Sequence, residues 1–177
     1  MYQSTGFWYQ FKLFNKETNL VALDWWNGCR TPLSNSHLTG VIAGLTLHTA
    51  PEEIYLALIE ATAYGTKKII ETFVNYGIPI EKIVISGGIA KKNKLITQIY
   101  SNILNREVFI ADTLYPGALG ASIYSLLSLK PYSNDIIKTI QTFQSKTHSI
   151  IQPEEKMDYY SKKYVRYLEL FEFFKSK

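Results

Sequence analysis

The spacing of apolar side chains in the middle of the chain predicts its principal helix. Between residues 51 and 76, apolar or small residues recur on one face at intervals of three or four: Ile54, Leu58, Ala61, Gly65 and Ile69. Thr49-Ala50-Pro51-Glu52 precedes this pattern in the form of a capping box, and Gly77 and Pro79 end it. Because glycine inside a helix costs about 1 kcal/mol relative to alanine, we expect Gly65 to pack closely against another element.

Short apolar runs on both sides of this helix predict strands. They occupy residues 20–26, 83–85 and 107–111. In the first of them, Trp25 and Trp26 are expected to serve in packing. The run at residues 38–47 is apolar and glycine-spaced, and its pattern fits a strand or a short helix. Because strands alternate with helices over residues 20–129, the predicted fold class is α/β.

Four further helices are predicted beyond the central one. The first spans residues 94–104, and the second begins at Gly117. Ser133 is expected to cap a third that reaches Phe143, and residues 144–152 are expected to be extended. Pro153 begins the last helix. Its aromatic stripe is typical of a face that docks on a core: Tyr160, Tyr164, Tyr167, Phe171 and Phe174.

One turn organises the whole pattern. The strand Ile83-Val84-Ile85 runs directly into Ser86-Gly87-Gly88, and the helix at residues 94–104 follows. Glycine accepts positive φ and lets a ligand approach the backbone, while the start of a helix offers free N–H groups. This order fits a cradle for a nucleotide or an anion. It also fits a tight turn that binds nothing, and the residues alone leave both interpretations open.

Composition and charge narrow the class of protein. The chain has 177 residues, of which 46% are hydrophobic and 19% charged, which is typical of a globular domain with its own core. A net charge of +4 with short, separated lysine clusters argues against nucleic acid as a partner. The single cysteine excludes an internal disulfide and a cysteine-rich zinc site. Since no apolar run is long enough to span a bilayer and no signal-peptide pattern occurs, we expect a cytoplasmic protein without membrane contact.

Several residues of types that are often catalytic or metal-binding have no suitable partner nearby in this sequence. Cys29 lies in a turn with no neighbouring partner for nucleophilic chemistry, so we expect a bystander thiol. His37 and His48 have no second metal-ligating residue at helical spacing, so we expect surface or hydrogen-bonded histidines rather than metal ligands. Glu60 and Glu71 are expected to be solvated rather than catalytic. No metal site is predicted from these residues.

Several stretches of the chain resemble the FGGY carbohydrate kinases. Gly40-x-Ile42-x-Gly44-Leu45, followed after seven residues by Glu53-Ile54-x-x-Ala57-Leu58-Ile59-Glu60, fits the second signature of that family at every defined position. The runs at residues 23–33, 57–66 and 86–93 are similar to the branch of the family that acts on L-ribulose. The resemblance begins at Leu20 and continues to the C-terminus. It divides the chain into an unmatched segment, residues 1–19, and a kinase-like domain, residues 20–177.

The resemblance implies a fold and a ligand. Such kinases have two actin-like domains of the ribonuclease H type, and this chain corresponds to the second, incomplete at its N-terminal edge. The family pattern places the adenosine end of ATP on Gly87 and Gly88, with Lys92 or Asn93 beside them. It lets the segment from Gly117 to Ala121 close the adenine pocket. Lys92 stands where some relatives have asparagine, so this position departs from the family pattern. Mg²⁺ accompanies ATP in the intact enzyme.

The parts that the chain lacks bear on its activity. In this family the catalytic aspartate, the first phosphate-binding turn and most sugar contacts lie upstream, and the sequence contains no Asp-x-Gly-Thr loop. In the intact enzyme, the resemblance implies transfer of the γ-phosphoryl group of ATP to a ketopentose, L-ribulose, as in arabinose catabolism. The chain alone is not expected to be active, because positioning around the phosphates supplies the catalysis. Two alternatives stand beside this interpretation. One is a truncated, non-catalytic remnant that binds nucleotide or a partner, and the other is one half of a split kinase. Self-association through exposed apolar surface is also expected.

Overall fold

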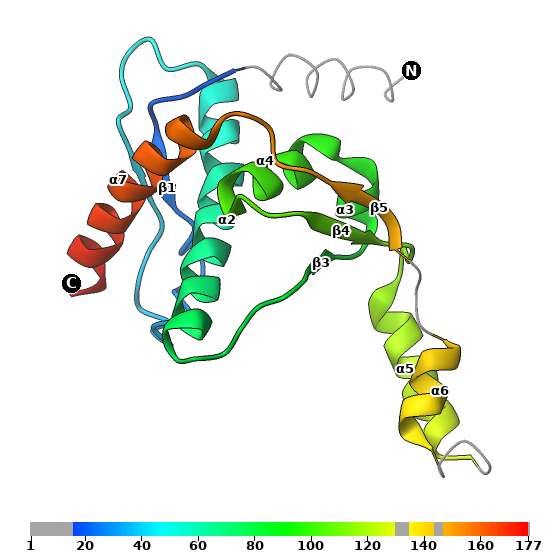
Figure 1. The fold of residues 1–177 in the computed structure, drawn as a ribbon. Coiled ribbons are helices and arrows are strands. Elements are labelled where there is room, and N and C mark those ends of the chain that lie inside the picture. Colours follow the sequence, from blue (N-terminus) through cyan, green and yellow to red (C-terminus); the bar gives the residue numbers. More distant parts are fainter. Residues whose placement is uncertain (1–15, 130–134, 144–146, 177) are drawn as a thin grey trace.

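The computed structural model of the chain describes residues 16–129, 135–143 and 147–176 (Figure 1). Its strands form two sheets. In the first, β1 (Val21–Leu23) pairs antiparallel with β2 (Val41–Ala43). In the second, the order is β3 (Ile83–Ile85), β4 (Val108–Ala111) and β5 (Thr147–Ile151), with β3 parallel and β5 antiparallel to β4. The α/β class predicted from the sequence is confirmed.

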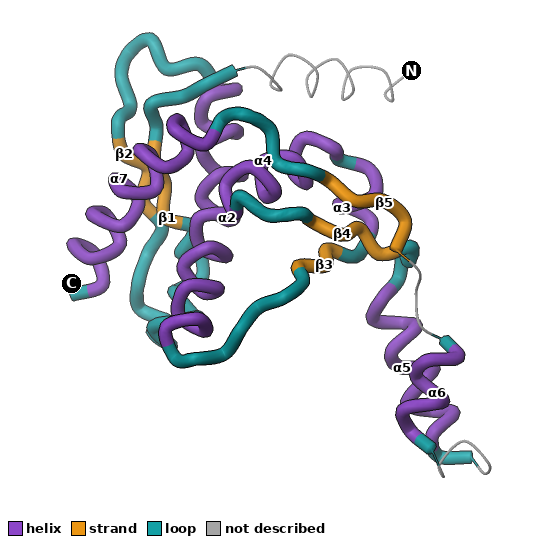
Figure 2. Tube along the Cα trace, viewed as in Figure 1, coloured by secondary structure: helices purple, strands orange, loops and turns teal. Residues whose placement is uncertain are grey.

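Helices connect and cover these strands. They are α2 (Pro51–Asn75), α3 (Gly88–Lys92), α4 (Lys94–Leu104), α5 (Pro116–Leu127), α6 (Ile136–Thr142) and α7 (Met157–Lys175). Figure 2 shows the two groups of strands on either side of α2 and α4. The main hydrophobic core joins side chains of β1, α2, α4 and α7, while a smaller cluster lies under the second sheet. In Figure 1, α5 and α6 lie beside each other and project away from this body.

The central helix forms as predicted, with two differences in detail. The Ala50 N–H donates a hydrogen bond to Glu53 Oε2 (2.8 Å), which is half of a capping box placed one residue later than the sequence suggested. The fully buried face also differs, because Ile54 and Leu58 are only half-buried. The buried side chains of the helix are Leu56, Ala57, Ile59, Glu60, Ala61, Ala63 and Tyr64. Gly65 faces Asp24, the residue that follows β1: a Cβ there would lie 3.2 Å from Asp24 Oδ1, so the expected close packing is confirmed.

The aromatic stripe of α7 docks on the core as predicted. Tyr164 stacks on Tyr64 of α2, with ring centroids 5.7 Å apart, and Phe171 meets Trp25 edge to face at 5.2 Å. The helix begins at Met157 and not at Pro153, so the predicted start was four residues early.

Three other expectations gain detail from the structure. The run at residues 38–47 contains a strand, β2, and the run at residues 20–26 is a strand only over β1. Trp25 is buried, whereas Trp26 is 57% exposed and lays its ring against Gly40. Ser133 lies outside the described residues, and Asp135 caps α6 by accepting a hydrogen bond from the Lys138 N–H (2.9 Å).

Candidate functional site

The Gly-Gly turn follows the carboxyl end of β3. Gly87 has a φ of +95°, a conformation that side chains other than glycine rarely adopt, and Gly88 begins α3. A Cβ built on Gly87 or Gly88 would meet no atom of the described chain within 4 Å. Backbone conformation therefore explains a glycine at position 87. At position 88, packing among the described residues gives no reason for one, and there is open space over the backbone.

A second turn lies beside the first because β3 and β4 are parallel neighbours. Ile85 and Ile110 are register partners, so the chain leaves both strands at the same edge of the sheet. The turn after β4 leads into α5, whose first turn contains Gly117. Gly117 is exposed, and a Cβ there would also meet nothing within 4 Å of the described atoms. In open α/β sheets, ligands bind outside the carboxyl ends of the strands, where these two turns lie.

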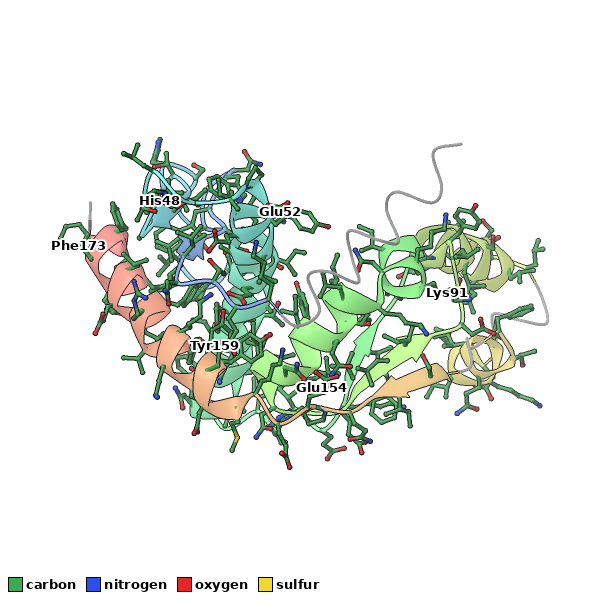
Figure 3. All side chains as sticks on the ribbon, turned by 90° about the horizontal axis from the view of Figure 1, so that it is seen from above. His48, Glu52, Lys91, Glu154, Tyr159 and Phe173 are labelled. Carbon is green, nitrogen blue, oxygen red and sulfur yellow. The ribbon has the colours of Figure 1, made fainter. Side chains whose placement is uncertain are left out.

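An ion pair joins the two turns. Lys91 Nζ lies 2.5 Å from Asp112 Oδ1, and the two side chains are 20% and 51% exposed. Lys91 also donates its backbone N–H to the Gly87 carbonyl (3.4 Å). The pair therefore connects the Gly-Gly turn to the segment between β4 and α5. In Figure 3, Lys91 lies in the part of the molecule where α5 begins, away from Tyr159 and Phe173.

Lys92 and Asn93, the other residues predicted for this site, lie at the end of α3. Lys92 is exposed. Asn93 has a structural task, because its Oδ1 accepts a hydrogen bond from the Ile96 N–H (3.2 Å) and caps α4. These two residues thus lie in the same segment as Gly87 and Gly88, residues 87–93. Strand pairing brings the segment that carries Gly117 next to it. Nucleotide contacts of these residues stay a prediction.

Sequence reasoning missed part of this site. Lys91 and Asp112 were not singled out, because 21 positions separate them and only the pairing of β3 with β4 brings them together. Exposed apolar side chains also flank the two turns: Ile89 is 69% exposed, Leu114 43% and Tyr115 74%. The feature of the sequence that could have indicated these residues is that each of them borders a glycine-containing turn.

A buried polar network elsewhere corrects the prediction for Glu60. Glu60 and Lys163 are 1% and 4% exposed and form an ion pair between α2 and α7. The Tyr159 hydroxyl lies 3.3 Å from Glu60 Oε1 and accepts a hydrogen bond from the Thr18 N–H (2.9 Å). Burial raises the pKa of Glu60, and the charge of Lys163 opposes that shift. Because the network is enclosed, its role is to hold α7 on α2.

Other isolated residues also find partners. Glu71 is half-buried and accepts a hydrogen bond from the Tyr164 hydroxyl (2.6 Å), so it has a partner and is only partly solvated. Cys29 is buried, and burial raises the pKa of its thiol, which fits a bystander rather than a nucleophile. His37 and His48 are exposed as expected.

The described residues contain neither a metal-binding cluster nor a membrane-spanning helix. Within the described ranges, no three His, Cys, Asp or Glu side chains gather where they could hold a metal ion. Over the same part of the chain, no helix is both long and apolar enough to cross a bilayer.

Comparisons with known proteins identify the class. The sequence model described as "FGGY family of carbohydrate kinases, C-terminal domain" matches residues 10–129, and the chain belongs to this family. Two solved structures share its fold. A xylulose kinase from Rhodospirillum rubrum aligns with a TM-score of 0.73 at 18% identity, over 97% of this chain and 35% of that one. A Plasmodium falciparum glycerol kinase with ADP aligns with a TM-score of 0.68 at 18% identity, over 93% and 33%. The fold is therefore part of an actin-like ATPase domain.

Among curated relatives, the similarity is to ribulokinases. The ribulokinase of Bacillus licheniformis is 42% identical over 164 residues, which are 89% of this chain and 29% of that protein. That of Staphylococcus aureus strain Newman is 40% identical over 160 residues, 90% of this chain and 28% of that protein. The chain thus corresponds to the C-terminal domain of ribulokinase-like sugar kinases and spans less than a third of their length. The division of the chain at Leu20 stays a prediction; the family match itself begins at residue 10.

Proposed function

We propose that this chain is the adenosine-binding part of a ribulokinase-like kinase. With an N-terminal domain that carries the catalytic aspartate and the phosphate loop, it transfers the γ-phosphoryl group of ATP to a ketopentose, L-ribulose. The observation that carries this proposal is the pair of adjacent turns at the carboxyl ends of β3 and β4, with open space over Gly87, Gly88 and Gly117. The reaction takes place in the cytoplasm, where ATP is available.

The residues at these turns fit the adenosine end of a nucleotide. The missing side chain at Gly88 lets a ligand approach the backbone. Exposed Ile89 and Tyr115 offer apolar surface of the kind that lines ligand sites. In the complete enzyme, Mg²⁺ would bind mainly through the nucleotide phosphates, as is usual for this ion. The role of this chain is to hold and orient the nucleotide, while the sugar and the phosphates are held by the N-terminal domain.

Saturation-transfer NMR on the full chain tests the proposal. With ADP as the probe, we expect transfer to the adenine and ribose protons and displacement of that signal by ATP. GDP, which carries the same phosphates on another base, should give a weaker signal because the proposed contacts are made to the adenosine end. If ADP receives no transfer, or if GDP and ADP bind equally, the proposed function is wrong.

A further inference from the structure

We propose that Lys91 and Asp112 are positioning residues, whose ion pair fixes the two turns of the nucleotide site relative to each other. This inference rests on the proposed function. It concerns residues that contact each other rather than the ligand. The two turns leave neighbouring strands, but each then continues into a different helix, α3 or α5. The pairing of β3 with β4 ends at Ile85 and Ile110, so the spacing of the turns depends on contacts beyond these two strands.

Lys91 contacts both turns. Its backbone N–H donates a hydrogen bond to the Gly87 carbonyl, and its side chain forms an ion pair with Asp112. Asp112 lies five residues before Gly117, in the segment that connects β4 to α5. A ligand that bridges the Gly-Gly turn and the start of α5 binds best when these two surfaces are already set at the right distance.

The environment of the pair supports a positioning role more than a role in stability. Both side chains are partly exposed to water, at 20% and 51%. Exposed ion pairs contribute little to folding, so losing this one should leave the melting temperature almost unchanged. Its loss should instead lower ligand affinity at the adjacent binding site, because a small change in the spacing of the turns alters the fit of the ligand.

Charge reversal separates positioning from other roles of Lys91. Three variants are compared: Lys91→Asp, Lys91→Arg, and a double exchange that combines Lys91→Asp with Asp112→Lys. The matched control is Lys94→Asp, which changes an exposed lysine at the start of α4. ADP affinity is measured by ligand-detected NMR on the full chain, and folding by thermal melting. We expect Lys91→Asp to weaken ADP binding about fivefold or more, because it also places two carboxylates together. Lys91→Arg and the double exchange should restore affinity to within about twofold of the parent, since each rebuilds an ion pair.

Each result decides between explanations. If Lys91→Asp binds ADP like the parent, or no more weakly than Lys94→Asp, the pair has no positioning role. If Lys91→Arg binds ADP but the double exchange does not, Lys91 contacts the nucleotide directly and the inference is wrong. If the parent itself does not bind ADP, the proposed function fails and the inference fails with it. A melting temperature that falls in step with affinity would assign the pair to stability and would also overturn the inference.

Discussion

Glu60 and Lys163, 103 residues apart in the sequence, form an ion pair that the protein encloses almost completely, at 1% and 4% exposure. The pair joins the middle of α2 to α7, and the Tyr159 hydroxyl lies 3.2 Å from Lys163 Nζ. Replacing a buried pair by apolar side chains is often harmless, whereas removing one partner leaves a buried charge without compensation.

We therefore expect Lys163→Met to lower the free energy of unfolding by about 3–5 kcal/mol near neutral pH. Burial already raises the pKa of Glu60, and loss of Lys163, which opposes that shift, raises it further. A raised pKa in the folded state gives stability that is present at low pH and lost as the pH rises through it. The variant should thus be closer to the parent at pH 5 than at pH 7.5.

Denaturant unfolding at the two pH values measures this effect, with Lys162→Met as the control on the exposed neighbouring lysine. If Lys163→Met is no less stable than Lys162→Met, the pair does not hold α7 in place. A destabilisation that is the same at both pH values would contradict the role assigned to the Glu60 charge.

Cys29 should be unreactive in the folded protein. Its side chain is 3% exposed, and burial raises the pKa of the thiol, so the thiolate is scarce at pH 8. A disulfide reagent such as dithionitrobenzoate should label it at least about tenfold more slowly in the native chain than in denaturant, where a free cysteine has a pKa near 8.5. Labelling at the same rate in both states would show that the thiol is accessible.

The helical pair α5–α6 should drive self-association of the isolated chain. Exposed apolar side chains gather on it, with Tyr124 80% exposed, Ile137 69% and Ile136 55%. Exposed apolar surface of this kind marks interaction sites. In light scattering at increasing concentration, the average mass should rise for the parent and stay lower for Ile137→Glu. Val165→Glu, at a 56% exposed position on α7, is the control. A parent that stays monomeric at high concentration contradicts this prediction.

The isolated chain should not phosphorylate L-ribulose, because the sequence contains no Asp-x-Gly-Thr phosphate loop. When residues 20–177 replace the matching part of the Bacillus licheniformis ribulokinase, however, the chimaera should regain ATP-dependent activity, since the relative supplies the N-terminal part. A coupled kinase assay measures both. Turnover by the isolated chain, free of host kinases, would overturn the first expectation, and a folded but inactive chimaera would favour a non-catalytic remnant.

Local patterns in the sequence predicted most of the fold. The period of three to four residues and the stop at Gly77 placed α2, and the helix expected at residues 94–104 is α4 with the same bounds. These elements depend on neighbours in the chain, which a sequence shows directly. The separate short helix α3 was missed, because Asn93 ends one helix and caps the next within a single residue.

Contacts between distant segments could not be predicted in the same way. Nothing near Glu60 in the sequence indicates that Lys163 will neutralise it, so a lone carboxylate on a helix was expected to be solvated. The same holds for Lys91 and Asp112, which meet only because β3 and β4 pair in parallel. The candidate site was found by its glycines, while the charged residues that connect its two turns became visible only in the fold.

Gly88→Asp tests the central claim most directly. Gly88 does not need positive φ, and a Cβ there meets nothing within 4 Å of the described atoms, so the variant should fold like the parent. The added bulk and negative charge would occupy the space proposed for the nucleotide and repel its phosphates. Ser161→Asp, which adds the same charge at an exposed position on α7, is the control. With circular dichroism spectra that match, we expect Gly88→Asp to weaken ADP binding at least about tenfold in ligand-detected NMR, and Ser161→Asp to bind like the parent. If Gly88→Asp binds ADP as well as the parent does, the Gly-Gly turn is only a turn and the nucleotide site is not there.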